Sequence, residues 1–249
     1  MDDASTDESV PVINECISKH PQIGFLRLFR NQGNCKAFNQ ALERVEGDFI
    51  IDLAADDVLL PDRIRQGVMA LHRAGQDYGV HFTDAAWISE DGRQLYRHSD
   101  RFPHHTIPQG DVYGDLIARF FICSPSMMFR REVVEALGGY DESLDYEDFD
   151  FWIRSSREFR YCYTPEVLVK KRVVRNSMSE RQFVFWGRQL RSTFRVCEKV
   201  MALNRSVAEQ RSLQKRILYE MGVCLRLLHL PLFMKYVALY ISNKKQQYG

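Results

Sequence analysis

The stretch FIIDLAADDVLLPDRI, residues 49–64, decides the fold that we predict for this chain. An apolar run ends in two adjacent carboxylates, Asp56 and Asp57, and Pro61 then starts a helix. Such a run is typical of a buried strand, and open α/β sheets bind ligands at the carboxyl ends of their strands. Two neighbouring carboxylates repel each other unless a positive group lies beside them, and a divalent cation against a phosphate is the usual one. The pattern also fits a plain helix start, because Asp stabilises the first turn of a helix.

The composition is that of a soluble globular protein. The chain has 249 residues, of which 45% are hydrophobic and 27% charged, with a net charge of +1, so nothing global favours binding to nucleic acid. Six cysteines show neither a CxxC pair nor zinc spacing, which indicates reduced thiols in a cytosolic protein. The acidic N-terminal residues exclude a signal peptide, and no apolar run reaches the ~18 residues of a membrane span.

Strand and helix patterns alternate along most of the chain, which predicts an α/β fold with a mixed, mainly parallel sheet flanked by helices. A strand is expected at each of the residues 25–29, 49–56, 78–83 and 161–170. Helical spacing marks the residues 12–17, 37–45, 64–71, 131–137, 147–154 and most of the chain after 180. Glu90-Asp91-Gly92 predicts a hairpin, and residues 99–114 read as a long loop.

Several motifs stand in a fixed order along this pattern. They are DDASTD at 2–7, an N-x-G…A-x-N-x-A-L…G helix from Asn31 to Gly47, ADD at 55–57 with PDRI at 61–64, GYDE at 139–142, and ED at 147–148 with Trp152. Together they resemble family 2 glycosyltransferases with the GT-A fold. The resemblance covers residues 2–180, and linked motifs make it more specific than any one alone. It implies an enzyme that transfers a sugar from a nucleotide-sugar donor, for which a UDP-sugar is our first expectation, to a glycan or lipid-linked acceptor in polysaccharide biosynthesis.

The resemblance also assigns the donor site. It implies that Asp57 binds Mg²⁺ or Mn²⁺, that Asp56 contacts the ribose or shares the metal, and that Asp3 accepts a hydrogen bond from the base. It implies that Arg172, in a tail that runs to Ser179, holds the departing diphosphate. A cation there would neutralise the charge that builds on the diphosphate. Asp3 also fits a helix N-cap, although less well than the donor site, and Arg172 equally fits a solvated surface that includes Lys170 and Lys171.

For the transfer itself, the resemblance makes Asp148 the general base of an inverting reaction. Glu147 lies beside it and is expected to raise its pKa by like-charge repulsion. The alternative is a purely structural role, in which both acids only stabilise the N-terminus of a helix. Trp152 fits the core at least as well as a sugar platform, and His104 and His105 in the long loop fit exposed side chains better than ligands.

Two departures from the family pattern stand out. Position 54 is Ala where many relatives carry the first Asp of a D-x-D motif. The chain also begins at the DDASTD turn, so we expect a glycosyltransferase domain over residues 1–179 that lacks its N-terminal strand-loop-helix segment. This expectation leaves open an alternative function, that of a non-catalytic remnant that binds sugar nucleotide or partners. A nucleotidyltransferase is disfavoured because no glycine-rich phosphate loop is present.

Residues 180–249 are expected to form a C-terminal helical extension. The stretch 217–241 is strongly apolar but carries Glu220, Arg226 and Lys235, so it does not suit a membrane span. It fits packing against the domain or a second subunit, and it also fits peripheral contact with a membrane surface. We therefore expect a cytoplasmic protein, with a place at the inner face of the membrane as the alternative.

Overall fold

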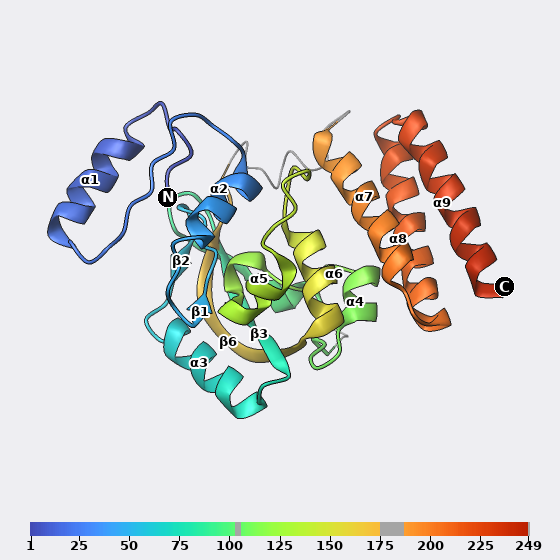
Figure 1. Ribbon diagram of the computed structural model, residues 1–249, viewed down its shortest axis with the longest axis horizontal. Helices are drawn as coiled ribbons and strands as arrows, with labels where there is room; N and C mark the ends of the chain where they lie inside the picture. The colour runs from blue at the N-terminus through green and yellow to red at the C-terminus, as the bar shows by residue number, and fades with distance from the viewer. Residues whose placement is uncertain (103–105, 175–186, 249) are drawn as a thin grey trace.

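A computed structural model describes residues 1–102, 106–174 and 187–248 (Figure 1). The helices are α1 (Ser9–Lys19), α2 (Asn34–Leu42), α3 (Arg63–Ala74), α4 (Tyr113–Ala118), α5 (Arg131–Leu137), α6 (Asp148–Glu158), α7 (Arg188–Leu203), α8 (Val207–Arg226) and α9 (Leu230–Tyr248), with 3-10 turns η1 (His98–Arg101) and η2 (Ser124–Ser126). The strands are β1 (Phe49–Ile50), β2 (Val58–Leu59), β3 (Tyr78–Ile88), β4 (Gln94–Arg97), β5 (Met128–Arg130) and β6 (Arg160–Arg172).

One sheet joins these strands in the order β1-β5-β3-β6-β2, and β4 pairs with the end of β3, at Ala86–Ile88. The two long strands β3 and β6 run parallel and form the centre of the sheet. The predicted α/β class with a mixed sheet flanked by helices is confirmed: the long β3–β6 ladder is parallel, and the other four strand pairings among the described residues are short and antiparallel. Two of the predicted strands contribute little to the sheet. Residues 25–29 form only a bridge between Arg27 and Asp2, and the predicted strand at 49–56 pairs only at Phe49–Ile50.

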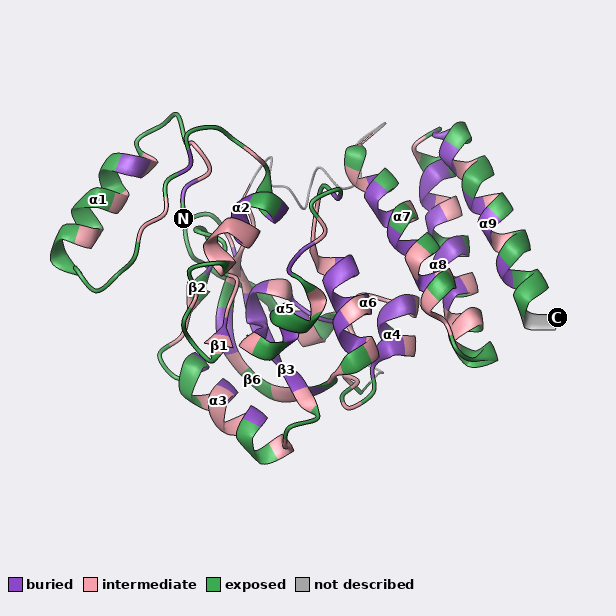
Figure 2. Ribbon diagram, in the orientation of Figure 1, coloured by how far each residue is buried: buried purple, intermediate pink, exposed green. Residues whose placement is uncertain are grey.

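The core lies between the sheet and the helices α4, α5 and α6. Burial is densest at β3, β5 and α6, whereas α1 projects from the body on the side opposite α7–α9 and is largely exposed (Figures 1 and 2). The C-terminal helices are part of this core: Cys197 on α7, Ile217 on α8 and Tyr236 on α9 belong to the same hydrophobic cluster as Phe149 on α6. The described part of residues 180–249 therefore packs on the domain through an extensive apolar contact.

The C-terminal region is helical, as expected, with turns at 204–206 and 227–229. Ser206 caps α8: its hydroxyl accepts a hydrogen bond from Glu209 N, and the Glu209 carboxylate accepts one in return from Ser206 N. Within the described residues, no helix has the length and apolar character needed to cross a membrane.

Candidate functional site

Four of the predicted site residues meet in one cavity of about 1630 Å³. Asp3 comes from the N-terminal turn, Asp57 from the turn after β1, and Glu147 and Asp148 from the start of α6. Helices α7 and α8 close the cavity with side chains that include Leu190 and Tyr219. Segments far apart in the sequence therefore form a single polar site.

Helix α2 positions the loop that leads to Asp148. The Asn39 side chain accepts a hydrogen bond from Tyr140 N at 2.8 Å and donates one to Tyr140 O at 2.9 Å. Gly139 has φ +82°, and a Cβ at this position would lie 2.5 Å from Asn39 Oδ1, so only glycine fits. Asn34 Nδ2 donates to Glu147 Oε2 at 2.7 Å. The α2 asparagines therefore hold the GYDE loop and the acidic pair in place.

Asp57 is one of two acids from the 49–64 stretch that face the cavity, and Asp52 is the other. Asp57 Oδ1 accepts a hydrogen bond from Arg172 N at 2.8 Å, and Lys171 Nζ lies 3.9 Å from Asp57 Oδ2. Burial raises the pKa of the Asp57 carboxyl, while the Arg172 amide and the Lys171 ammonium oppose the rise. β6 therefore delivers both a hydrogen bond and a cation to this carboxylate.

Asp56 and Arg172 do not line the cavity. Asp56 is exposed, and its carbonyl oxygen accepts from Arg172 Nε at 3.0 Å. The Arg172 guanidinium also donates to the carbonyl oxygens of Ser89 and Glu90. In this arrangement Arg172 fastens the acidic turn to the β3–β4 hairpin, and its contact with a diphosphate stays a prediction, as does the role of Asp56.

Asp3 holds the neighbouring turn. Its two carboxylate oxygens each accept a backbone hydrogen bond at 2.9 Å, from Gln32 N and Gly33 N. This long-range contact differs from the helix N-cap that its position before α1 suggested. Each oxygen keeps a further lone pair, so the predicted contact with a nucleobase stays a prediction.

A third carboxylate, Asp52, joins the acidic pair. Burial raises the Glu147 pKa, and the charges of Asp148 and Asp52 raise it further. Burial also raises the pKa of Asp148, against a hydrogen bond from the Ser124 side chain. Asp52 accepts a hydrogen bond from Tyr140 Oη at 3.0 Å, and burial raises its pKa to about 6 despite that bond. Each deprotonation in this group makes the next one harder, so the site binds a proton more tightly than isolated carboxyls do.

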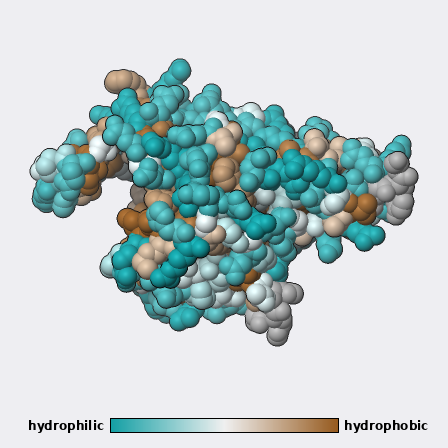
Figure 3. Space-filling view, turned by 60° about the horizontal axis from the view of Figure 1, so that its bottom comes forward, coloured by the Kyte–Doolittle hydropathy of each residue, from teal (hydrophilic) through white to brown (hydrophobic). Residues whose placement is uncertain are grey.

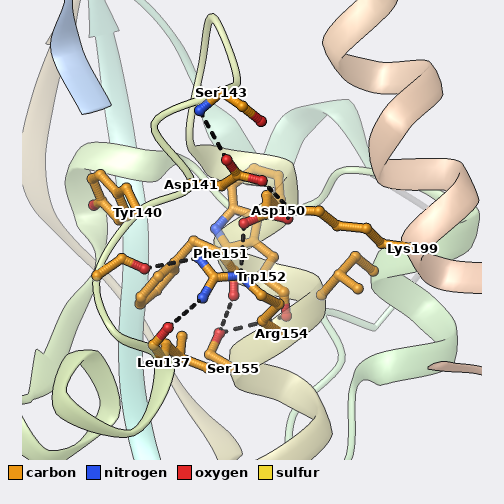
Figure 4. Close-up of polar contacts among 12 residues, drawn as sticks. Leu137, Tyr140, Asp141, Ser143, Asp150, Phe151, Trp152, Arg154, Ser155 and Lys199 are labelled. Atoms are coloured by element: carbon orange, nitrogen blue, oxygen red, sulfur yellow. Dashed lines mark hydrogen bonds and ion pairs between the residues drawn. The ribbon is translucent and has the colours of Figure 1, made fainter. Parts of the chain in front are cut away.

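An ion-pair network stands behind the acidic pair (Figure 4). Asp150 on α6 is 1% exposed and contacts both Arg154, at 2.6 Å, and Lys199 from α7. The Lys199 Nζ also lies 2.5 Å from Asp141 Oδ2. Arg154 in turn donates to the Gly139 carbonyl oxygen at 2.8 Å. The network therefore fastens the GYDE loop and the first turn of α6 to the C-terminal helices.

Asp57 is the cavity carboxylate that we test as a candidate metal ligand. Within the described residues, no three His, Cys, Asp or Glu side chains form a group that could hold a metal ion. Mg²⁺ is commonly bound through one or two carboxylates together with substrate phosphates. Asp57 fits that pattern, because it faces the cavity and its Oδ2 lies beyond hydrogen-bond distance of Lys171.

Sequence reasoning missed Asp52 and Lys171. Asp52 stands two residues before Ala54, so alternation along the predicted strand was a signal for it. Lys171 was grouped with a solvated basic run, and only the pairing of β6 beside β3 brings it over the Trp87 ring and toward Asp57. Trp152 is buried and its indole N–H contacts Met127 Sδ, which matches the core interpretation. His104, His105 and residues 175–179 of the predicted tail lie outside the described residues.

The sequence of this chain matches a known protein family. The family model described as Glycosyl transferase family 2 matches residues 1–138, more than half of the chain. The chain belongs to glycosyltransferase family 2.

Relatives of known name support the assignment. An uncharacterized glycosyltransferase of Methanocaldococcus jannaschii is 27% identical over 179 residues, which make up 70% of this chain and 58% of that protein. The putative teichuronic acid biosynthesis glycosyltransferase TuaG of Bacillus subtilis is 24% identical over 184 residues, or 74% of this chain and 69% of that protein. The chain covers 53% of a Rickettsia prowazekii relative. It thus spans little more than half the length of several relatives that it matches.

Solved structures show the same fold. S. aureus TarS in complex with UDP-GlcNAc superposes with a TM-score of 0.70 at 15% identity, over 97% of this chain and 70% of that chain. The mannosyltransferase PcManGT from Pyrobaculum calidifontis, in complex with GDP-Man and Mn²⁺, gives a TM-score of 0.61 at 16% identity, over 99% of this chain and 72% of that chain. The likeness establishes the GT-A fold.

Proposed function

We propose that this chain transfers a sugar from a nucleotide-sugar donor to a hydroxyl group of a glycan or lipid-linked acceptor, with inversion at the anomeric carbon. The observation that carries the proposal is the single cavity in which Asp3, Asp57, Glu147 and Asp148 meet. Relatives named for teichuronic acid and amylovoran biosynthesis favour a role in polysaccharide assembly.

Asp148 is the general base in this proposal. Its carboxylate takes the proton of the acceptor hydroxyl while that oxygen attacks the anomeric carbon and the nucleoside diphosphate leaves. A positioned base contributes about 10²- to 10⁴-fold to such a step. The raised pKa of Asp148 suits the role, because a stronger base accepts the proton more readily. Burial is what raises the pKa of Asp148, and the charge of Asp148 in turn helps to raise the pKa of Glu147 beside it.

In this proposal Asp57 would hold Mg²⁺ or Mn²⁺ together with the phosphates of the donor. A bound cation would offset the negative charge that develops on the departing diphosphate. The chain itself contributes Lys171, whose ammonium lies beside Asp57 and the Trp87 ring and is placed to attract the same diphosphate. Asp3 is proposed to contact the base of the nucleotide, and Asp56 and Arg172 to support the ribose and diphosphate.

Isothermal titration calorimetry with UDP and Mn²⁺ tests the donor half of the proposal. Binding that requires the metal supports it, and no heat at millimolar UDP would overturn it. Release of UDP from a panel of UDP-sugars, with glycan and lipid-linked acceptors, tests the transfer half. Metal-dependent binding with no transfer to any acceptor would instead match the alternative of a binding module.

A further inference from the structure

We propose that the outer face of the α8–α9 hairpin docks on a membrane surface rich in anionic lipid headgroups. This face comprises the exposed large apolar residues and the exposed cations of the two helices. The apolar members are Leu218, Tyr219, Leu225, Leu228, Leu230, Met234 and Ile241. The cationic members are Arg211, Lys215, Arg226, Lys235, Lys244 and Lys245.

The apolar residues form a stripe that the fold leaves uncovered. Leu230, Met234, Ala238 and Ile241 recur at intervals of four, four and three residues, so they share one side of α9. The opposite side, with Leu232, Tyr236 and Leu239, is already buried in the core. A helix that is apolar on both sides needs an apolar medium on each of them. Hydrophobic side chains are visible on the outer helices near the C-terminal end, beside hydrophilic ones (Figure 3).

The turn between the helices exposes a leucine, Leu228, in an unfavourable left-handed backbone conformation. Leu228 has φ +51° and is 71% exposed. The left-handed region disfavours a branched side chain and suits Gly or Asn. A leucine there adds almost no packing to the fold, and its exposed apolar side chain is available for a contact made outside the molecule.

The positive charge of this face indicates that its binding partner is anionic. Residues 207–248 contain only two acids, and both are used inside the fold: Glu209 pairs with Arg157, and the buried Glu220 pairs with Arg216. None of the six exposed cations makes an ion pair with a described residue. A cationic face with an apolar stripe is typical of a helix that lies in the membrane interface.

A second copy of the chain fits this face less well. A two-fold dimer would set the same patch against itself, so Arg226, Lys235 and Lys245 would meet like charges with no exposed acid of the hairpin to offset them. An anionic membrane offsets these charges and covers the stripe at once. The face also adjoins the cavity, because Tyr219 of α8 belongs to both, and a docked chain would hold the cavity beside the lipid surface.

Sedimentation of the full chain with vesicles tests the proposal without any donor or acceptor. Vesicles of phosphatidylcholine with about a third phosphatidylglycerol should bind the chain at least tenfold more tightly than phosphatidylcholine alone, since each Lys or Arg at an anionic surface adds roughly fivefold. Added salt should weaken the binding. No binding to the anionic vesicles, or equal binding to both kinds, overturns the proposal.

Three variants locate the contact. Met234→Glu, at a position that is 62% exposed, should weaken vesicle binding at least about tenfold, whereas Ile64→Glu, at a 59% exposed position on α3, should leave it unchanged. Leu228→Asn should also weaken binding while its thermal midpoint stays equal or rises, because Asn tolerates the left-handed conformation. Unchanged binding in Met234→Glu and Leu228→Asn would overturn the proposal.

Two further outcomes would assign the face to another occupant. A concentration-dependent dimer that Met234→Glu dissociates would make the face a contact between copies of the chain. Salt-sensitive binding of an acidic protein, without vesicle binding, would make it a protein-binding site. Because vesicle binding needs no catalysis, its failure leaves the proposed sugar transfer untouched, and failure of UDP to bind leaves the membrane proposal untouched.

Discussion

Lys199, on the first of the C-terminal helices, forms an ion pair with Asp150, which lies two residues beyond Asp148 on α6. The same ammonium contacts Asp141 of the GYDE loop. The C-terminal helices therefore do more than cover the domain: they hold the loop and the helix start on which the proposed base depends.

Replacing Lys199 should affect both stability and transfer. In Lys199→Met, Asp150 stays buried with Arg154 as its remaining cation, and we expect the free energy of unfolding to fall by about 2 kcal/mol. A shift of the α6 start should lower kcat about tenfold with little change in KM for the donor. Chemical denaturation and UDP-release kinetics measure the two effects, and Lys199→Arg should restore most of each.

The matched control for this charge removal is Lys19→Met. Lys19 pairs with Glu15 on α1, where both side chains are mostly exposed, so the expected cost is below about 0.5 kcal/mol. If Lys199→Met cost no more than Lys19→Met and left kcat unchanged, the network would have no positioning role.

Asp148→Asn should stop transfer while sparing donor binding. The amide has the size of the carboxylate but cannot accept the acceptor proton, so kcat should fall by about 10²- to 10⁴-fold. The affinity for UDP with Mn²⁺, measured by calorimetry, should stay within about twofold, because the proposed base acts on the acceptor hydroxyl and not on the nucleotide. Loss of UDP binding in this variant would argue against a role as base alone.

Asp57→Asn should weaken the metal-dependent part of donor binding. The amide oxygen still accepts the Arg172 N–H, so the turn should keep its shape, and we expect the UDP affinity in Mn²⁺ to fall at least about tenfold. Asp56→Asn is the paired comparison, since Asp56 lies outside the cavity. A loss in Asp56→Asn as large as in Asp57→Asn would mean that both acids hold the metal. Turnover that survives removal of Mg²⁺ and Mn²⁺ by EDTA would exclude the metal role.

Asp52 should make stability depend on pH between about 4 and 6. Its pKa rises from 3.8 to about 6 in the folded state, so its contribution is fully present below pH 3.8 and is lost as the pH rises through about 6. Asparagine at position 52 cannot ionise. Between pH 4 and pH 7, the free energy of unfolding of Asp52→Asn should therefore increase relative to that of the wild type by up to roughly 3 kcal/mol. Urea denaturation at several pH values measures the difference, and a gap that does not change with pH would show that Asp52 is not buried as described.

Periodicity located most helices, because an amphipathic helix carries its 3.6-residue pattern wherever it packs. The helices at 131–137 and 64–71 appear as α5 and α3. Strands were less predictable: residues 25–29 have the alternation but pair only at Arg27, and β2 at Val58–Leu59 was not expected. A strand exists only where a partner lies beside it, and the partner is set by the tertiary fold.

The acidic turn at Asp56 and Asp57 shows most clearly what the sequence and what the tertiary structure decide. The amino-acid sequence by itself determined the class of protein, since the linked motifs from residue 2 to residue 148 predicted the family whose model matches residues 1–138, and it determined which acids are available. Only the tertiary structure decided which of them share the cavity. It turned Asp57 inward and left Asp56 outside, and it added Asp52 and Lys171. The physical reason is that the burial, hydrogen bonds and charges that set the properties of these acids come from β6, α2, α6 and α7. These elements are distant in sequence, and no local pattern predicts that they pack together.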